Sequence, residues 1–119
     1  MYLFVLVFIF VKLIVATKTG EWQLADKKGS FVNYDNTNTW YELNENNKKL
    51  FTFEAIKHNT KNQIVLEDKS RGLYLKISGK IMLFSYNKED ILQDDFSQIL
   101  YYGKWVIVPN QSKIIIEYI

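Results

Sequence analysis

The densest group of polar side chains that could perform chemistry is the stretch Asp68-Lys69-Ser70-Arg71-Gly72. Asp68 and Arg71 can present a carboxylate and a guanidinium to a glycan or a peptide. The same residues also suit a tight turn, in which Asp68 accepts hydrogen bonds from turn amides and Gly72 takes a positive φ. We favour the turn, and we therefore expect Gly72 to be required by the backbone and Arg71 to be replaceable.

Catalytic groups of the usual kinds are scarce in this chain. His58, the one histidine, lies in an expected turn without the neighbouring carboxylate and nucleophile that a general base requires. The absence of cysteine excludes thiol catalysis and thiolate metal sites. The acids between positions 89 and 95 do not match the spacing of a calcium-binding loop. We expect no metal, no cofactor and no enzymatic activity, and a small hydrolase that uses two carboxylates is the alternative.

Aromatic side chains are the strongest remaining signal for binding, because they make up 16% of the chain. The three tryptophans are expected to fill the core, whereas outward-facing tyrosines can stack on sugars or contact a protein surface. Alternation along residues 73–77 places Tyr74 opposite a face of three aliphatic side chains. We predict a ligand-binding surface formed by Tyr74, Tyr41, Lys76 and Arg71.

The elements that must position these residues are short strands. Apolar runs alternate with polar turns, and no long 3.6-residue period is present. We expect one all-β domain over residues 17–119, with about nine or ten antiparallel strands. This density of strands is typical of a β-trefoil, a small closed barrel or a sandwich. The tripeptides Gly20-Glu21-Trp22 and Gly103-Lys104-Trp105 echo each other.

Several turns can be placed from residue type. Polar turns are expected at residues 26–29, with Gly29 at a positive φ, and at residues 35–38. A further turn at Ser78-Gly79 is expected to return Ile81 and Leu83 to the same face as Leu73, Leu75 and Ile77. Asn87 is expected to cap a short helical turn.

The first sixteen residues are unlike the rest, because they form an apolar run interrupted by Lys12. This is the length of the apolar region of a signal peptide, and Ala16 suits the position before a cleavage site. We expect a signal peptide over residues 1–16 and a secreted protein, the alternatives being an uncleaved anchor and a buried strand. Asn110-Gln111-Ser112 matches the sequon for N-glycosylation. The match predicts a glycan on Asn110, and the alternative is that it arises by chance.

The net charge and the scattered basic residues limit which classes of partner we expect. The expected mature chain is nearly neutral, and its basic residues do not cluster. Nucleic acid and anionic membrane surfaces require a clustered positive field, so we expect neither as a partner after signal cleavage. We expect an extracellular glycan or protein as partner and leave the oligomeric state open. A structural or matrix protein without a small ligand is the other alternative, with residues 114–119 as an edge strand for assembly.

From Phe51 the chain reads F-x-F-E, then I-x-L-x-D-x-S-R-G-L-Y-L-K-I, then a hairpin, and later Phe96. This resembles a repeat of the β-trefoil proteins, such as fibroblast growth factors and fascins, over residues 51–105. The resemblance implies a trefoil-like fold, but the basic cluster by which those growth factors bind heparin is reduced here to Lys104 and Lys113. No growth-factor activity and no site residue therefore carry over. The pattern is also similar to small secreted all-β proteins of invertebrates, for which no activity is established.

Overall fold

The computed structural model describes residues 11–60, 63–93, 98–108 and 112–118. These residues form nine strands and one short helix. The elements are β1 (Val11–Leu24), β2 (Gly29–Tyr34), β3 (Thr39–Asn44), β4 (Lys49–Thr60), β5 (Gln63–Asp68), β6 (Leu73–Ser78), β7 (Ile81–Ser85), α1 (Lys88–Gln93), β8 (Gln98–Trp105) and β9 (Ser112–Tyr118). The prediction of an all-β fold is therefore confirmed, and His58 lies in β4 rather than in a turn.

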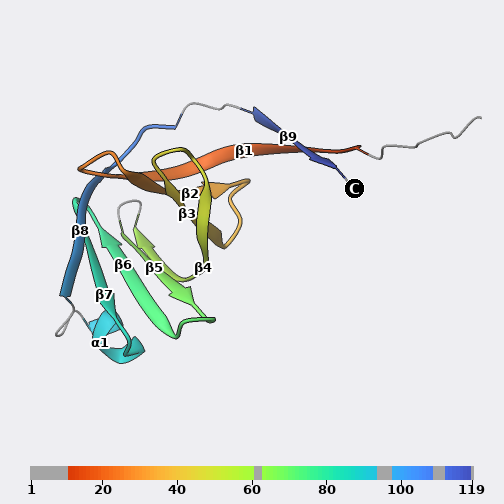
Figure 1. Ribbon diagram of the computed structural model, residues 1–119. Helices are drawn as coiled ribbons and strands as arrows, with labels where there is room; N and C mark the ends of the chain where they lie inside the picture. The colour runs from red at the N-terminus through yellow and green to blue at the C-terminus, as the bar shows by residue number, and fades with distance from the viewer. Residues whose placement is uncertain (1–10, 61–62, 94–97, 109–111, 119) are drawn as a thin grey trace, which may run out of the picture.

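Strands β1 to β8 form a closed antiparallel barrel (Figure 1). Each strand pairs with the next along the chain, and β1 closes the sheet because it pairs with both β2 and β8. At the point of closure Trp22 lies between Phe31 of β2 and Trp105 of β8. Of the three architectures that the sequence predicted, the chain adopts the closed barrel.

The interior of the barrel is filled by large side chains. Trp22, Phe31 and Phe53 form a chain of tilted rings, with centroids 6.4 and 5.8 Å apart. The indole nitrogen of Trp22 donates a hydrogen bond of 2.9 Å to the carbonyl oxygen of Gly79, so this buried ring leaves no polar atom unpaired. The whole core cluster is Trp22, Phe31, Trp40, Phe53, Ile64, Leu66, Leu73, Leu75, Ile77 and Met82. An eight-stranded barrel is just wide enough to be filled in this way.

The register of the β6–β7 hairpin corrects one prediction. Leu75 pairs with Phe84 and Ile77 pairs with Met82, so the even-numbered residues of β7 face the core. Ile81 and Leu83, which we expected there, lie on the opposite face. The reason is the turn itself, because Ser78 pairs with Ile81 and the loop is Gly79-Lys80 rather than Ser78-Gly79. A shift of one residue exchanges the two faces of a strand.

The turn between β1 and β2 also differs from expectation. Lys27, with a φ of 62°, takes the left-handed position that we assigned to Gly29. Gly29 begins β2 instead, and a Cβ atom there would lie 2.8 Å from the carbonyl oxygen of Leu43. The glycine is therefore needed for close strand packing. The loop at residues 35–38 and the cap of α1 follow the prediction, since the Asn87 side chain accepts a hydrogen bond from the amide of Glu89.

Strand β1 continues beyond the barrel. Its residues from Val11 to Thr17 pair with β9 and form a two-stranded ribbon, which leaves the top of the barrel in Figure 1. Its residues from Lys18 onward pair with β2 and belong to the barrel. The last six residues of the expected signal peptide therefore lie in the ribbon, and residues 1–10 and Asn110 lie outside the described residues.

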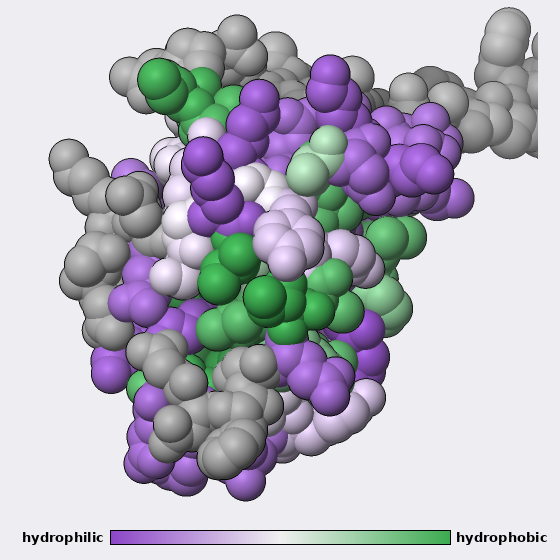
Figure 2. Space-filling view, turned by 90° about the vertical axis from the view of Figure 1, so that its left-hand side faces the viewer, coloured by the Kyte–Doolittle hydropathy of each residue, from purple (hydrophilic) through white to green (hydrophobic). Residues whose placement is uncertain are grey.

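The outer surface of the barrel is uneven. Helix α1 packs against β6 and β7 and buries Ile91. Strand β8 is exposed along residues 98–102, where Ile99 and Leu100 are open to solvent and Tyr102 is 61% exposed. Figure 2 shows the face that carries this strand, with an apolar patch at its centre and hydrophilic residues around it.

Candidate functional site

The stretch from Asp68 to Gly72 is the turn between β5 and β6. Asp68 Oδ1 accepts hydrogen bonds from the amide of Ser70 (3.0 Å), the Ser70 hydroxyl (2.6 Å) and the amide of Arg71 (3.2 Å). The Nε atom of Arg71 donates to Asp68 Oδ2. Gly72 has a φ of 64°, which confirms the left-handed position predicted for it.

Arg71 makes more contacts than is usual for a residue in a surface turn, because it touches both Phe51 and Asp68. Its guanidinium lies 3.5 Å from the centroid of the Phe51 ring, and the Asp68 side chain that it contacts is only 3% exposed. Burial alone raises the pKa of Asp68, but the hydrogen bonds from Ser70 and Arg71 and the charge of Arg71 outweigh it, so the pKa lies below its ordinary value. The pair therefore shapes the turn, and its contacts lead us to expect that Arg71 is less replaceable than its position in a turn predicts.

The other residues of the predicted binding surface are not brought together. Tyr74 lies on β6, where a hydrogen bond to Glu67 raises the pKa of its phenol. Tyr41 lies on β3, with the Lys49 ammonium 3.9 Å from its ring centroid. Strands β4 and β5 separate the two tyrosines. Lys76 is 3% exposed, so its side chain does not contribute to an open surface.

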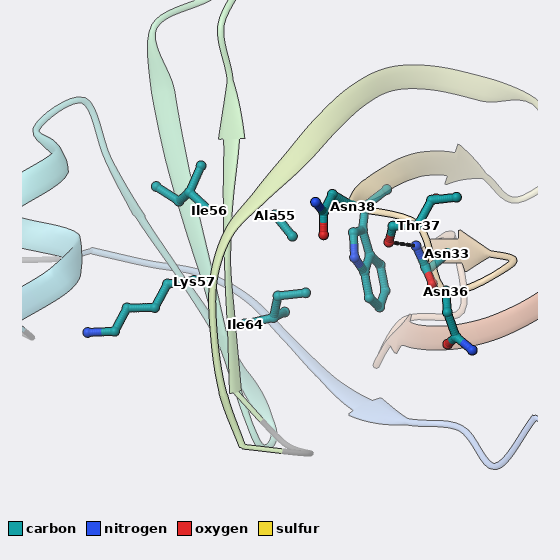
Figure 3. A pocket seen from close by; sticks show the side chains of 9 residues that line it. Asn33, Asn36, Thr37, Asn38, Ala55, Ile56, Lys57 and Ile64 are labelled. Atoms are coloured by element: carbon teal, nitrogen blue, oxygen red, sulfur yellow. Dashed lines mark hydrogen bonds between the residues drawn. The ribbon is translucent and has the colours of Figure 1, made fainter.

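A polar hollow lies instead at one end of the barrel. Its volume is about 460 Å³, and it separates the β2–β3 loop from the bulged part of β4 and the start of β5 (Figure 3). A second hollow of about 330 Å³ adjoins it, because both are bounded by Asn33, Asn36 and Trp40. The first hollow is lined by Asn33, Asn36, Thr37, Asn38, Trp40, Ala55, Ile56, Lys57 and Ile64. We call the two adjoining hollows together the amide groove.

The loop that supplies the amides is fixed by Asn33. Its side-chain nitrogen donates to the carbonyl oxygens of Thr37 and Thr39, at 2.8 Å in each case. Its side-chain oxygen accepts a hydrogen bond of 2.6 Å from the Thr19 hydroxyl, which itself accepts one from the amide of Asn36. Asn33 is buried, and these bonds use both of its donors and its oxygen, so it is a structural residue that ties the loop to β1.

Asn36 and Asn38 carry the amides that are left for a ligand. Both residues are exposed, and within the described part of the chain neither side-chain amide makes a hydrogen bond. Asn36 has a φ of 53°, a left-handed conformation that asparagine tolerates better than most residues. The loop conformation is thus compatible with this residue type and keeps both amides at the groove.

Trp40 forms the rigid floor between the two hollows. Its side chain is 5% exposed and meets Trp105 edge to face, with ring centroids 6.1 Å apart. A Cβ atom on Gly20 would lie 2.7 Å from the Trp40 ring, so Gly20 is the residue type that admits this indole. The ring edge and the amides together give the groove an apolar base and hydrogen-bonding walls.

Two charged side chains line the groove. Its charged side chains are Lys57 in the first hollow and Glu21 in the second, and Glu21 is paired with Lys18 at 3.2 Å. The described residues contain no group of three potential metal ligands. In the same residues, no helix is long and apolar enough to span a membrane.

No protein-family model matches the chain, and neither a curated protein nor a solved structure is significantly similar to it. Sequence reasoning identified residues 35–38 as a loop but did not assign it a role in binding. The sequence feature that could have indicated the groove is the run of short polar side chains at residues 35–39, directly before Trp40.

Proposed function

We propose that this protein is a non-catalytic binding module, and that the amide groove recognises a neutral glycan. The observation that carries the proposal is the placement of two uncommitted side-chain amides, Asn36 and Asn38, at the rim of a groove with an indole at its base. Each side-chain amide offers two donors and one acceptor group. Adjacent sugar hydroxyls require this mixture of donors and acceptors.

Two properties of the groove favour a glycan over other ligand classes. The groove has no concentration of charge, so it offers little to a phosphate or a carboxylate beyond Lys57. Its loop is also held by the Asn33 hydrogen bonds before any ligand arrives. A rigid site loses less conformational freedom on binding, which matters for a ligand that makes only weak individual contacts.

A glycan array with site-directed variants tests this proposal. The protein should bind at least one neutral oligosaccharide, and Asn36→Ala and Asn38→Ala should each weaken that binding about three- to tenfold, the range expected for one lost hydrogen bond. Asn46→Ala is the matched control, because Asn46 is an exposed turn residue at the other end of the barrel. Binding to no glycan, or equal affinity in all four proteins, contradicts the proposal.

We also propose that the protein is secreted after cleavage behind Ala16. The barrel part of β1 is compatible with this cleavage, because the barrel register begins at Lys18. The cleavage removes six of the seven β1 residues that pair with β9, so β9 keeps only its pairing with Thr17. Cleavage there leaves every residue of β1 that pairs with β2 or β8 in place. N-terminal sequencing of the protein from the medium of a secretory host should begin at Thr17, and an exported protein that retains Met1 contradicts this proposal.

A further inference from the structure

A second cavity lies at the opposite end of the barrel from the amide groove. It has a volume of about 260 Å³ and is mostly apolar. Phe51, Leu100 and Tyr101 form an exposed rim, and Phe53 and Leu75 belong to the core below it. The complete lining is Glu42, Phe51, Phe53, Arg71, Leu73, Leu75, Phe84, Leu100 and Tyr101. We call this cavity the acidic mouth.

Two charged side chains line the acidic mouth, Glu42 and Arg71, and a third charge, Asp68, lies beside Arg71 outside the lining. Arg71 is neutralised by Asp68, which it contacts through Nε. Glu42 is the remaining charge, so the three groups sum to one negative charge. Glu42 projects from β3 toward the interior, since it pairs with Phe31 and Phe51 on either side. In the described part of the chain, no donor makes a hydrogen bond to its carboxylate.

We propose that the acidic mouth binds an amine that carries an apolar body, with its ammonium group on the Glu42 carboxylate and its apolar part against Phe51, Leu100 and Tyr101. This site is independent of the amide groove and does not rest on glycan binding.

The state of Glu42 explains why an ammonium group fits better than a neutral or an anionic group. Burial is the main influence on Glu42 and raises its pKa, Arg71 lowers it, and Asp68 raises it again. The ionised carboxylate therefore lacks solvation that its neighbours do not replace. An ammonium supplies both the opposite charge and the missing donors. An anion would meet Glu42 and the Asp68–Arg71 pair, whose charges sum to −1.

The shape of the mouth sets the size of the ligand. A cavity of about 260 Å³ is below the range usual for drug-sized molecules, so it suits a single ring or a short alkyl chain. The Arg71 guanidinium already covers one face of Phe51, and Leu100 and Tyr101 border the other side of the opening. A ligand with one aromatic ring and a two-carbon amine arm matches this arrangement.

The test is an NMR titration of the ¹⁵N-labelled protein, purified from a secretory host, with 2-phenylethylamine and with the matched alcohol 2-phenylethanol. The amine should bind with a Kd on the order of 1 mM, as its few atoms allow, and shift the backbone amides of Glu42, Leu73 and Leu100. The alcohol should bind at least about fivefold more weakly, because it lacks the charge.

Glu42→Gln should weaken binding of the amine about tenfold, which corresponds to one charge-assisted hydrogen bond, and should leave binding of the alcohol unchanged. The variant should fold, since the substitution keeps the size of the side chain and removes a poorly solvated charge. Glu45→Gln is the matched control, because it changes the same charge in the exposed turn that follows β3.

Three results overturn the proposal. The first is equal binding of amine and alcohol, and the second is amine binding that Glu42→Gln and Glu45→Gln affect equally. The third is a chemical-shift change at the Glu42 amide that depends on protein concentration rather than on amine concentration. That result would show that the acidic mouth contacts a second copy of the chain. The glycan proposal is unaffected by any of these results, because its residues lie at the other end of the barrel.

Discussion

Replacing Arg71 by alanine should destabilise the fold by about 2 kcal/mol, although the residue lies in a surface turn. The variant removes a donor from a carboxylate that is 3% exposed, and a hydrogen bond to such a charged group contributes about 1.5–3 kcal/mol. It also removes the contact with the Phe51 ring, worth about 0.5–1 kcal/mol at an exposed site. Because the Arg71 side chain is 35% exposed, water replaces part of both interactions and the sum is reduced.

Urea denaturation at neutral pH measures this free energy directly. Lys69→Ala is the matched control from the same turn, since Lys69 forms an ion pair of 3.1 Å with Glu54 but both side chains are mostly exposed. Its midpoint should not change measurably. Arg71→Lys should lie between the wild type and Arg71→Ala, because lysine keeps the charge but not the planar guanidinium.

The order of these variants tests whether the burial of Asp68 determines the loss of stability. If Lys69→Ala is as destabilising as Arg71→Ala, the burial of Asp68 does not determine the cost. If Arg71→Ala costs less than about 0.5 kcal/mol, the turn is held by the Ser70 and backbone hydrogen bonds alone.

Three further predictions concern pH, packing and the loop of the amide groove. Because the folded pKa of Asp68 lies below its unfolded value, its contribution to stability is present above about pH 4 and is lost as the pH falls below that; urea midpoints between pH 2 and 5 should therefore fall more steeply for the wild type than for Asp68→Asn. Gly103→Ala should destabilise by about 1–3 kcal/mol in urea denaturation, because its Cβ would lie 2.4 Å from the carbonyl oxygen of Gln23 and 2.6 Å from the Trp22 ring. Asn33→Ala should destabilise by about 2 kcal/mol, since it leaves the carbonyls of Thr37 and Thr39 and the Thr19 hydroxyl without their partner; a change within 0.5 kcal/mol would show that water replaces all three bonds.

Local features of the fold were readable from the sequence. Alternation along residues 73–77 identifies the core face of β6, because a strand has a period of two. The left-handed φ of Gly72 follows from turn chemistry. The face of β7 was not readable, because it depends on whether the loop is Gly79-Lys80 or Ser78-Gly79, and both suit a turn.

Long-range features were not readable, because they depend on pairings that no local pattern encodes. The echo of Gly20-Glu21-Trp22 in Gly103-Lys104-Trp105 has a physical meaning only after closure of the barrel. Trp22 pairs with Trp105, and each glycine leaves room for a tryptophan ring of another strand. Tyr41 and Tyr74 face outward as alternation requires, but the number of strands between them was unknown. The burial of Lys76 likewise depends on packing outside its own strand.

The measurement that tests glycan binding most directly is chemical-shift mapping of the ¹⁵N-labelled protein with the oligosaccharide that binds best on the array. The largest shifts should fall on the side-chain amides of Asn36 and Asn38 and on the indole of Trp40, with little change at Glu42 or Leu100. Shifts centred on Tyr41 or Tyr74, or at the acidic mouth, would contradict the assignment of the amide groove as the glycan site.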